Sequence, residues 1–283
     1  MKIERTAGPT LTALELDADD ELFFTLGSGT VRHIVLKKAK AFVSEKGTPP
    51  GGKGTGVLRY RIACWLEIDG YAVHLTRNIP SQENFRDPPE LMGMRIWFDA
   101  VDGIFDFLEE NHGTCRPKKA ARFAVWDAAQ RICPCLVHPW CPLPRNGLSV
   151  NDCYRGEDTW LGPYDGRQCH GGLDINHPAG TPLWAPFAFD AHEMFNRVNA
   201  GANNNRWRGT VRWDEDREWI LGSNHIVRLL VPEGEPVRAG TRYAEGAGVL
   251  SGSHEHSHFV FTVRESGDEI MLDPWLLFRQ MYI

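Results

Sequence analysis

The sequence of 283 residues has no stretch of about 18–20 apolar residues, the length that a membrane-spanning helix needs. Its start, Met1–Thr6, is not followed by the apolar segment of a signal peptide. It also lacks a basic stripe, since 31 Lys and Arg and 37 Asp and Glu give a net charge of −6 with both signs mixed along the chain. Phosphate backbones attract clustered cations, so we expect no nucleic acid partner and no membrane span.

Cysteine, in contrast, is concentrated in one part of the chain. Five of the seven cysteines fall within a loop-rich stretch heavy in Pro, Gly and Trp, namely Cys133, Cys135, Cys141, Cys153 and Cys169. This density is typical of disulfides in an oxidising compartment. Free thiols are one alternative, and a second metal site at Cys133, Cys135 and Cys141 is another, although that spacing fits no standard zinc ribbon. We expect an extracytoplasmic location (periplasm, cell envelope or secreted), with the signal absent from this sequence, and a cytoplasmic location as the alternative.

The first part of the chain alternates strand patterns with turn signals. Leu22–Leu26, Thr30–Leu36 and Val57–Ile68 read as strands, separated by Gly27-Ser28-Gly29 and by a Gly- and Pro-rich segment. Apolar residues then recur at helical spacing from Trp97 to Leu108 and stop near Gly113, which predicts one amphipathic helix. The pattern as a whole indicates antiparallel β-structure with one helix.

The length leaves room for one large or two ordinary domains. We expect an N-terminal β-rich domain of unknown role over residues 1–132 and a second domain over 133–283. Residues 133–165 of the second domain form an irregular entry segment rich in Cys and Pro.

Two short histidine motifs indicate a metal site. In His256-Ser257-His258, residues two apart on a β-strand point to the same face about 6.5–7 Å apart, so both rings can lean toward one ion. In His170-Gly171-Gly172-Leu173-Asp174, the two glycines let the chain bend so that the imidazole and the carboxylate converge. Two imidazoles and one carboxylate leave the fourth position of a tetrahedral zinc open, as in catalytic sites. His254 shares the strand face with His256 and His258, so spacing alone does not decide which two of the three matter.

At these residues the sequence resembles the LytM and lysostaphin-type zinc metallopeptidases, the peptidase M23 family of cell-wall endopeptidases. The first anchor is His170-x-x-x-Asp174 followed by His256-x-His258-Phe259. The resemblance extends from about Asp165 to Pro274 through three further anchors: Gly180-Thr181-Pro182-Leu183-Trp184-Ala185, the glycine-containing hairpin Val231–Gly240, and Asp273-Pro274. Four ordered anchors make a more specific match than a His-x-His pair alone.

The resemblance implies an antiparallel β catalytic domain of the barrel-sandwich type with Zn²⁺ held by His170, Asp174 and His258. It implies His256 and His225 as the catalytic histidines that act on water and on the tetrahedral intermediate. His225 has the family spacing, nine residues before Gly234, although its neighbours Asn224 and Ile226 differ from the family's Ala and Leu. The implied activity is attack of a zinc-bound water on an amide bond in peptidoglycan stem peptides or cross-bridges.

Three alternatives accompany this interpretation. The hairpin pattern also occurs in biotinyl and lipoyl carrier domains, but no Lys follows Lys119 to serve as their attachment residue. An inactive relative that regulates or binds the cell wall would normally lack a ligand, and none is missing here. A zinc peptidase acting on a peptide other than peptidoglycan is the third. We interpret the remaining histidines as ordinary fold or surface residues: His33, His74, His112, His138, His177 and His192.

Overall fold

The computed structural model describes residues 1–50, 52–111, 115–135, 137–156, 158–196, 205–248 and 255–282. Strands dominate these residues, and α1 (Trp275–Met281) is the one α-helix among them, which confirms the expected mainly β class. The chain divides into two compact units. The first unit is Met1–Pro134 with Leu161–Gly171, and the second is Cys135–Trp160 with Gly172–Ile283. The boundary at 132/133 stays a prediction.

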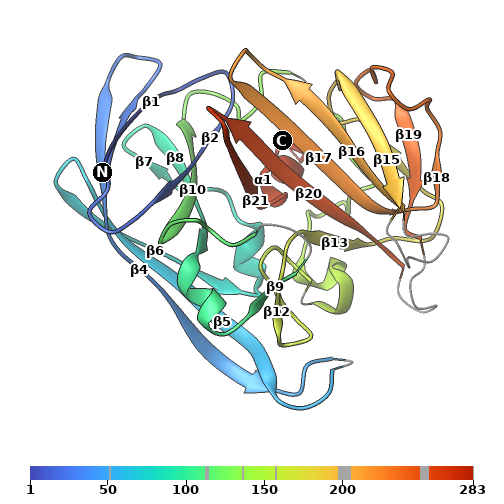
Figure 1. Cartoon of the computed structure of the whole chain (residues 1–283), viewed down its shortest axis with the longest axis horizontal. Helices are drawn as coiled ribbons and strands as arrows, with labels where there is room; N and C mark the ends of the chain where they lie inside the picture. The colour runs from blue at the N-terminus through green and yellow to red at the C-terminus, as the bar shows by residue number, and fades with distance from the viewer. Residues whose placement is uncertain are drawn as a thin grey trace. The chain divides into compact units, whose positions relative to one another are not determined.

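The first unit contains a five-stranded and a four-stranded sheet (Figure 1). The five-stranded sheet has the order β1 (Lys2–Thr6), β3 (Glu21–Thr25), β4 (Val31–Gly47), β5 (Gly56–Ile68) and β6 (Tyr71–Ile79). The other has the order β2 (Thr12–Leu16), β10 (Ala121–Asp127), β8 (Met94–Val101) and β7 (Glu90–Leu91). A small cavity of about 10 Å³ is lined from both sheets, for example by Leu66 of β5 and Phe123 of β10, so the two sheets share one apolar core.

The strands predicted between Leu22 and Ile68 are confirmed as the antiparallel ladder β3-β4-β5. The helix predicted from Trp97 is wrong. Trp97 and Val101 lie in β8, Ile104 lies in a short 3-10 helix, η2 (Asp102–Asp106), and Gly113 lies outside the described residues. Nearly every position of β8 is buried, so its apolar residues form a continuous run, which also satisfies a helical spacing.

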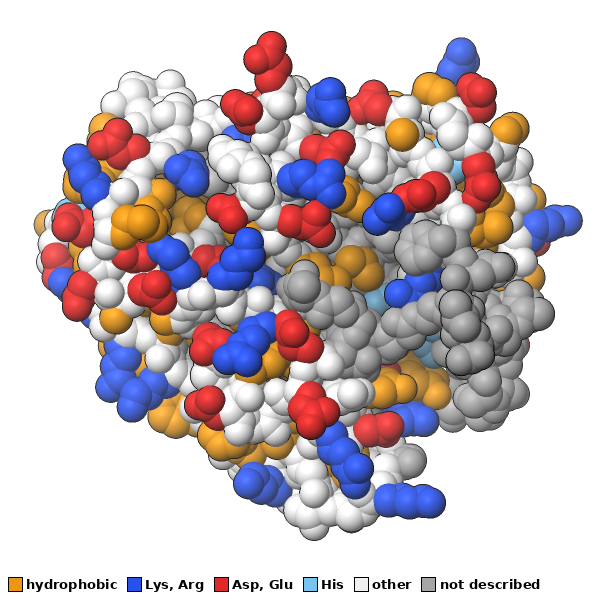
Figure 2. All heavy atoms as spheres, viewed as in Figure 1, with side chains coloured by type: hydrophobic (Ala, Val, Ile, Leu, Met, Phe, Trp, Pro, Cys, Tyr) orange, Lys and Arg blue, Asp and Glu red, His pale blue; other side chains and the backbone are white. Residues whose placement is uncertain are grey.

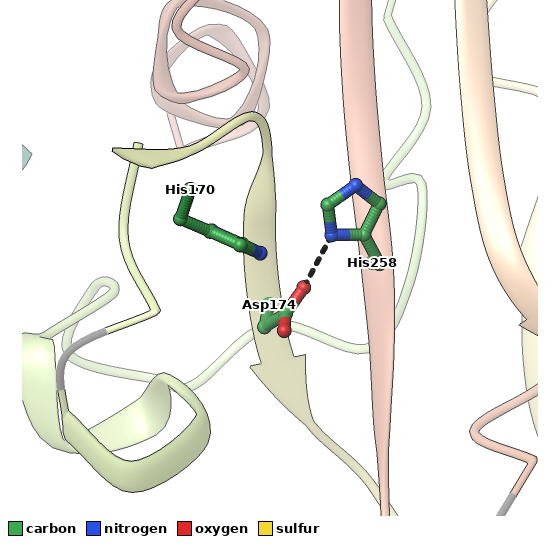
Figure 3. Close-up of side chains that lie close together, drawn as sticks. All are labelled: His170, Asp174 and His258. Carbon is green, nitrogen blue, oxygen red and sulfur yellow. Dashed lines mark hydrogen bonds and ion pairs between the residues drawn. The ribbon is translucent and has the colours of Figure 1, made fainter. Parts of the chain in front are cut away.

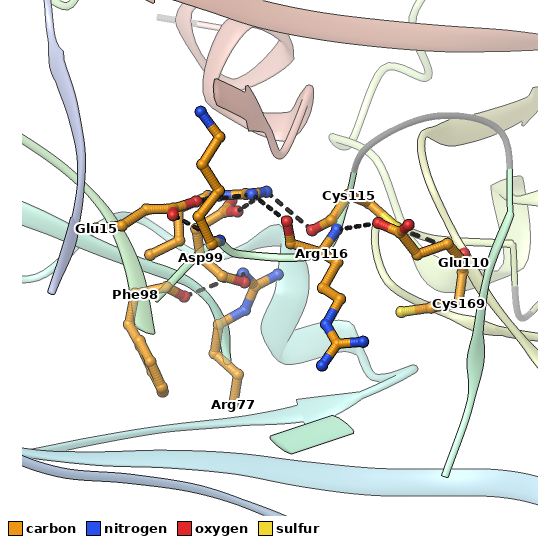
Figure 4. Close-up of polar contacts among 10 residues, drawn as sticks. Glu15, Arg77, Phe98, Asp99, Glu110, Cys115, Arg116 and Cys169 are labelled. Carbon is orange, nitrogen blue, oxygen red and sulfur yellow. Dashed lines mark hydrogen bonds and ion pairs between the residues drawn. The ribbon is translucent and has the colours of Figure 1, made fainter. Parts of the chain in front are cut away.

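A polar network in the first unit links Glu15 to Cys169, in the strand that carries His170 (Figure 4). Arg122 donates through Nε to Glu15 at 2.9 Å and through Nη1 to the carbonyl oxygen of Cys115 at 2.9 Å. The thiol of Cys115 in turn lies 3.8 Å from the carbonyl oxygen of Cys169, to which it donates. Cys169 belongs to β12 (Gln168–His170), which pairs with β9 (Glu109–Asn111) and β11 (Pro163–Tyr164). His170 therefore lies in a strand that pairs with a neighbour on both sides.

The second unit is built on a larger sheet, whose strands β20, β17, β16 and β15 run side by side in Figure 1. Its order is β13 (Leu173–Asn176), β20 (His256–Glu265), β17 (Arg217–Ile226), β16 (Asn205–Arg212) and β15 (Ala191–Asn196), with β21 (Asp268–Leu272) also pairing with β20. A second sheet has the order β14 (Thr181–Trp184), β19 (Arg242–Gly246) and β18 (Arg228–Leu229).

Aromatic side chains form the core beside β20. The Phe259 ring lies 4.7 Å from Trp140 and 5.1 Å from Phe278 of α1, and the Phe261 ring lies 4.9 Å from Trp219, all between ring centroids. Because side chains alternate along a strand, these phenylalanines face the core while His256 and His258 face the opposite side. The packing of one face of β20 thus fixes the direction of its histidines.

Charged side chains of both signs are interspersed over the face drawn in Figure 2. No continuous basic stripe crosses that face. Among the described residues, no helix is long and apolar enough to cross a membrane. The absence of a nucleic acid partner stays a prediction.

Candidate metal centre

Strand pairing brings together donors that are distant in the sequence. In the antiparallel pair of β13 and β20, Asp174 stands directly opposite His258, and Asn176 stands opposite His256. Directly opposite residues point to the same face of a sheet. Asp174 and His258 therefore meet although 84 positions separate them.

His170, Asp174 and His258 form a buried group with the composition of a metal site (Figure 3). One donor atom of each residue lies within 4.8 Å of the others, and the three residues are 1%, 3% and 3% exposed. Oδ1 of Asp174 lies 2.7 Å from Nδ1 of His258. Two atoms bound to one zinc at 2.0–2.2 Å lie about 3.4 Å apart in a tetrahedron, and the separations of the three donor atoms are of this order. The buried carboxylate also favours a cation there, because a buried charge needs an opposite one.

Gly172 provides the space for the His258 ring. A Cβ added at this position would lie 2.6 Å from Nε2 of His258 and 2.8 Å from the carbonyl oxygen of Phe259. The glycine between the two sequence ligands is thus required by close approach as well as by the bend of the chain.

Replacing Gly172 by alanine should therefore displace the ring of His258 and weaken metal binding, because neither the ring nor the β20 backbone has room for the methyl group. Zinc titration of the purified variant measures the effect. Gly103→Ala is the control, since among the described residues a Cβ there would come no closer to a heavy atom beyond its chain neighbours than 3.8 Å, to the backbone nitrogen of Ala41. Equal zinc affinity of both variants and wild type would contradict the steric argument.

The two predicted catalytic histidines lie beside this group. The ring centroids of His225 and His256 are 4.7 Å apart, and those of His225 and His258 are 6.4 Å apart. Nε2 of His256 lies 3.4 Å from Oδ2 of Asp174. His225 and His256 are both buried. Their catalytic roles stay predictions, and His254 lies outside the described residues.

A strand irregularity directs His225 toward this group. Asn224 pairs with His258, so on a regular strand the next residue, His225, would point to the other face of the sheet. The pairing of β17 with β16 shifts register here, and His225 has a φ of 63°. A bulge of this kind redirects a side chain, and a left-handed φ is uncommon for a residue other than glycine. The local sequence Ser223–Ile226 gives no sign of the bulge.

The structure also adds two residues that sequence reasoning did not place at the site. The ring of Tyr154 is stacked on that of His256, and no spacing rule links residues so far apart in an irregular segment. His177, interpreted above as an ordinary fold residue, follows β13 directly, and its amide donates to the carbonyl oxygen of Glu255 at 3.1 Å.

His177 is a buried histidine whose Nε2 has no hydrogen-bond partner among the described residues. Burial, and secondarily the charge of His256, lower the pKa of His177 from 6.5 to about 4. The folded protein then binds fewer protons at this ring than the unfolded chain does. Its contribution to stability is complete above pH 6.5 and is lost as the pH falls toward 4.

In urea unfolding between pH 7 and pH 4, His177→Leu should therefore lose less stability on acidification than wild type does. At 1.36 kcal/mol per pKa unit the difference approaches about 3 kcal/mol. His138→Leu, at an exposed position, serves as the control. Parallel stability curves for wild type and His177→Leu over this range would contradict the lowered pKa.

The cysteine expectations need correction. Cys141, Cys153 and Cys169 are buried thiols and carry no disulfide. Two of these thiols donate to backbone carbonyl oxygens: Cys153 to that of Ser149 and Cys169 to that of Leu161. In the part of the chain that the structure describes, one group of side chains could hold a metal ion, namely His170, Asp174 and His258. No such group there includes Cys133, Cys135 and Cys141.

Solved structures similar to this chain are M23, LytM and lysostaphin-type peptidases. A zinc-containing peptidase from Vibrio cholerae is 14% identical with a TM-score of 0.33, and the matched region spans 93% of this chain and 85% of the peptidase. A peptidase M23 from Pseudomonas aeruginosa is 14% identical with a TM-score of 0.28, and covers 90% and 94%. Lysostaphin from Staphylococcus simulans is 19% identical with a TM-score of 0.30, and covers 52% of this chain and 49% of its own.

The motifs had suggested a similarity over the C-terminal half alone. The matched regions of two of these structures extend beyond that half. Neither a protein-family model nor a curated protein matches the sequence. At these identities and TM-scores the function rests on the residues of the site.

Proposed function

We propose that this protein is a zinc-dependent endopeptidase that hydrolyses an amide bond in peptidoglycan stem peptides or cross-bridges. The observation that carries the proposal is the buried group of His170, Asp174 and His258 with two further histidines, His225 and His256, next to it. Three donors bind a metal and leave coordination positions open, while the additional imidazoles supply acid–base groups.

The donor types support zinc as the metal. Two imidazoles and one carboxylate are borderline ligands that zinc accepts in a tetrahedral arrangement with one open position. Bound there, Zn²⁺ would supply Lewis acidity, which lowers the pKa of water toward neutrality and polarises a carbonyl group. With one carboxylate among the ligands, the net charge of the occupied site is about +1.

Histidine side chains of the protein would accept and donate the protons of the reaction. A neutral imidazole accepts a proton from the attacking water, and a protonated one stabilises the oxyanion or donates to the leaving amine. His256 and His225 lie edge to face, with ring planes at 75°, so both can serve one reaction from different directions. Asp174 is in contact with His256 as well as His258, which orients both rings.

Incubation of the purified protein with peptidoglycan, with and without a metal chelator, tests the proposal. We expect new amino termini in the soluble fraction, detected by mass spectrometry, their loss with chelator and their return with added zinc. Zinc bound without cleavage of any peptide would favour an inactive regulator or wall-binding protein. Chelator-sensitive cleavage of other peptides but not of peptidoglycan would move the substrate to another class.

The cellular location stays part of the proposal. Peptidoglycan lies outside the cytoplasmic membrane, so the proposed substrate requires the enzyme in the periplasm, in the cell envelope or secreted. Fractionation of cells that produce the protein tests this directly.

A further inference from the structure

The ring of Tyr154 lies nearly flat against the ring of His256. Their centroids are 4.2 Å apart and their planes differ by 25°. Tyr154 is 6% exposed and His256 is 4% exposed, so the stack is buried. His225 meets the same imidazole at 75°, and Oδ2 of Asp174 lies 3.4 Å from its Nε2. The His256 ring is thus held by three side chains of the second unit.

A short, well-anchored segment carries Tyr154. The preceding turn, η3 (Val150–Asp152), begins with a capping box in which Ser149 and Asp152 bond reciprocally. Cys153 then forms an isolated β-bridge with Ile175 of β13, and Nδ2 of Asn176 donates to the carbonyl oxygen of Cys153 at 3.0 Å. The segment is therefore attached to the strand that stands next to His256.

The chain after Tyr154 returns to the same strand. The amide of Asp158 donates to the carbonyl oxygen of Tyr154 at 3.2 Å, and the amide of Asp174 donates to that of Asp158 at 3.0 Å. Arg155 has a left-handed φ of 56°, and its guanidinium lies 5.0 Å from the centroid of the Tyr154 ring. Such a backbone conformation is costly and persists where surrounding contacts enforce it.

We propose that Tyr154 is a positioning residue that fixes the orientation of the His256 ring by stacking on it. An imidazole turns about χ2 in broad energy wells, so its nitrogens point in a defined direction only if neighbours restrict the torsion. A ring packed flat against another provides that restriction, because rotation would drive one ring into the other. The hydroxyl of Tyr154 has no part in this role. The consequence for catalysis rests on the proposed function.

The first test compares Tyr154→Phe, which keeps the ring, with Tyr154→Leu, which removes it. The substrate is a preparation of soluble cross-linked muropeptides. We expect Tyr154→Leu to lower kcat by about 10²-fold, as misplaced catalytic groups do, with KM and zinc content unchanged. Tyr154→Phe should behave as wild type. Tyr282→Leu is the matched control, since it removes a tyrosine of the same unit that packs on Trp275 at 6.1 Å instead.

The second test needs no turnover. In NMR spectra of histidine-labelled protein, the ring protons of His256 should show the upfield shift that a stacked aromatic ring causes. This shift should persist in Tyr154→Phe and disappear in Tyr154→Leu. If wild type cleaves nothing, the proposed function fails, and the NMR comparison still decides whether Tyr154 orders the ring.

Three results would overturn the inference. Tyr154→Leu with wild-type kcat would show that the ring is not needed. Tyr154→Phe as impaired as Tyr154→Leu would assign the effect to the hydroxyl. A His256 spectrum unchanged in Tyr154→Leu would show that the two rings do not stack in solution.

Discussion

Replacing His258 by alanine is expected to remove zinc from the protein and abolish hydrolysis. His258 is one of three donors, its ring is 3% exposed, and its Nδ1 lies 2.7 Å from the carboxylate of Asp174. Two remaining donors cannot form the three-ligand site, and the variant leaves a buried carboxylate without its neighbour. Metal analysis of the purified protein should give about one zinc per chain for wild type and far less for the variant.

A histidine of the same unit provides the control for this experiment. His138 is exposed, and His138→Ala should keep both zinc and activity. Metal content that is equal in His258→Ala and wild type would contradict the ligand assignment. Circular dichroism and thermal unfolding of the variant, with and without zinc, separate loss of the metal from loss of the fold.

Replacing His256 by alanine should lower hydrolysis without removing the zinc. His256 is not part of the three-donor group, although its Nε2 lies 3.4 Å from Oδ2 of Asp174. The loss of a general acid or base lowers the rate by about 10²–10⁴-fold, so hydrolysis should fall by this factor while most of the zinc stays bound. Parallel measurement of zinc content and peptide release distinguishes the two variants.

If His256→Ala loses zinc as completely as His258→Ala, the assignment within the histidine run is wrong. The same pair of measurements on His225→Ala tests the second catalytic histidine. Retention of full activity there would leave His256 as the sole imidazole of the pair that acts on the substrate.

The sequence by itself determined most of the residues that converge at the candidate metal centre and part of the fold. Strand alternation and glycine flexibility are local properties that short motifs record, so the convergence of His170 and Asp174 with two histidines of the later run was predictable. The choice of His258 within that run came from the resemblance to the M23 family. The antiparallel ladder from β3 to β5 was also predictable, since turn residues and alternation define its strands. The helix from Trp97 was not, because a continuous apolar run satisfies both periodicities.

Only the tertiary structure decided where the surrounding groups lie. The pairing of β13 with β20 selects Asp174 opposite His258, and the register shift beside Asn205 turns His225 toward them. Tyr154 reaches His256 through a bridge between an irregular segment and β13. These features depend on which distant strands pair and in which register, and register is set by the hydrophobic packing of whole faces and not by the residues next to each position.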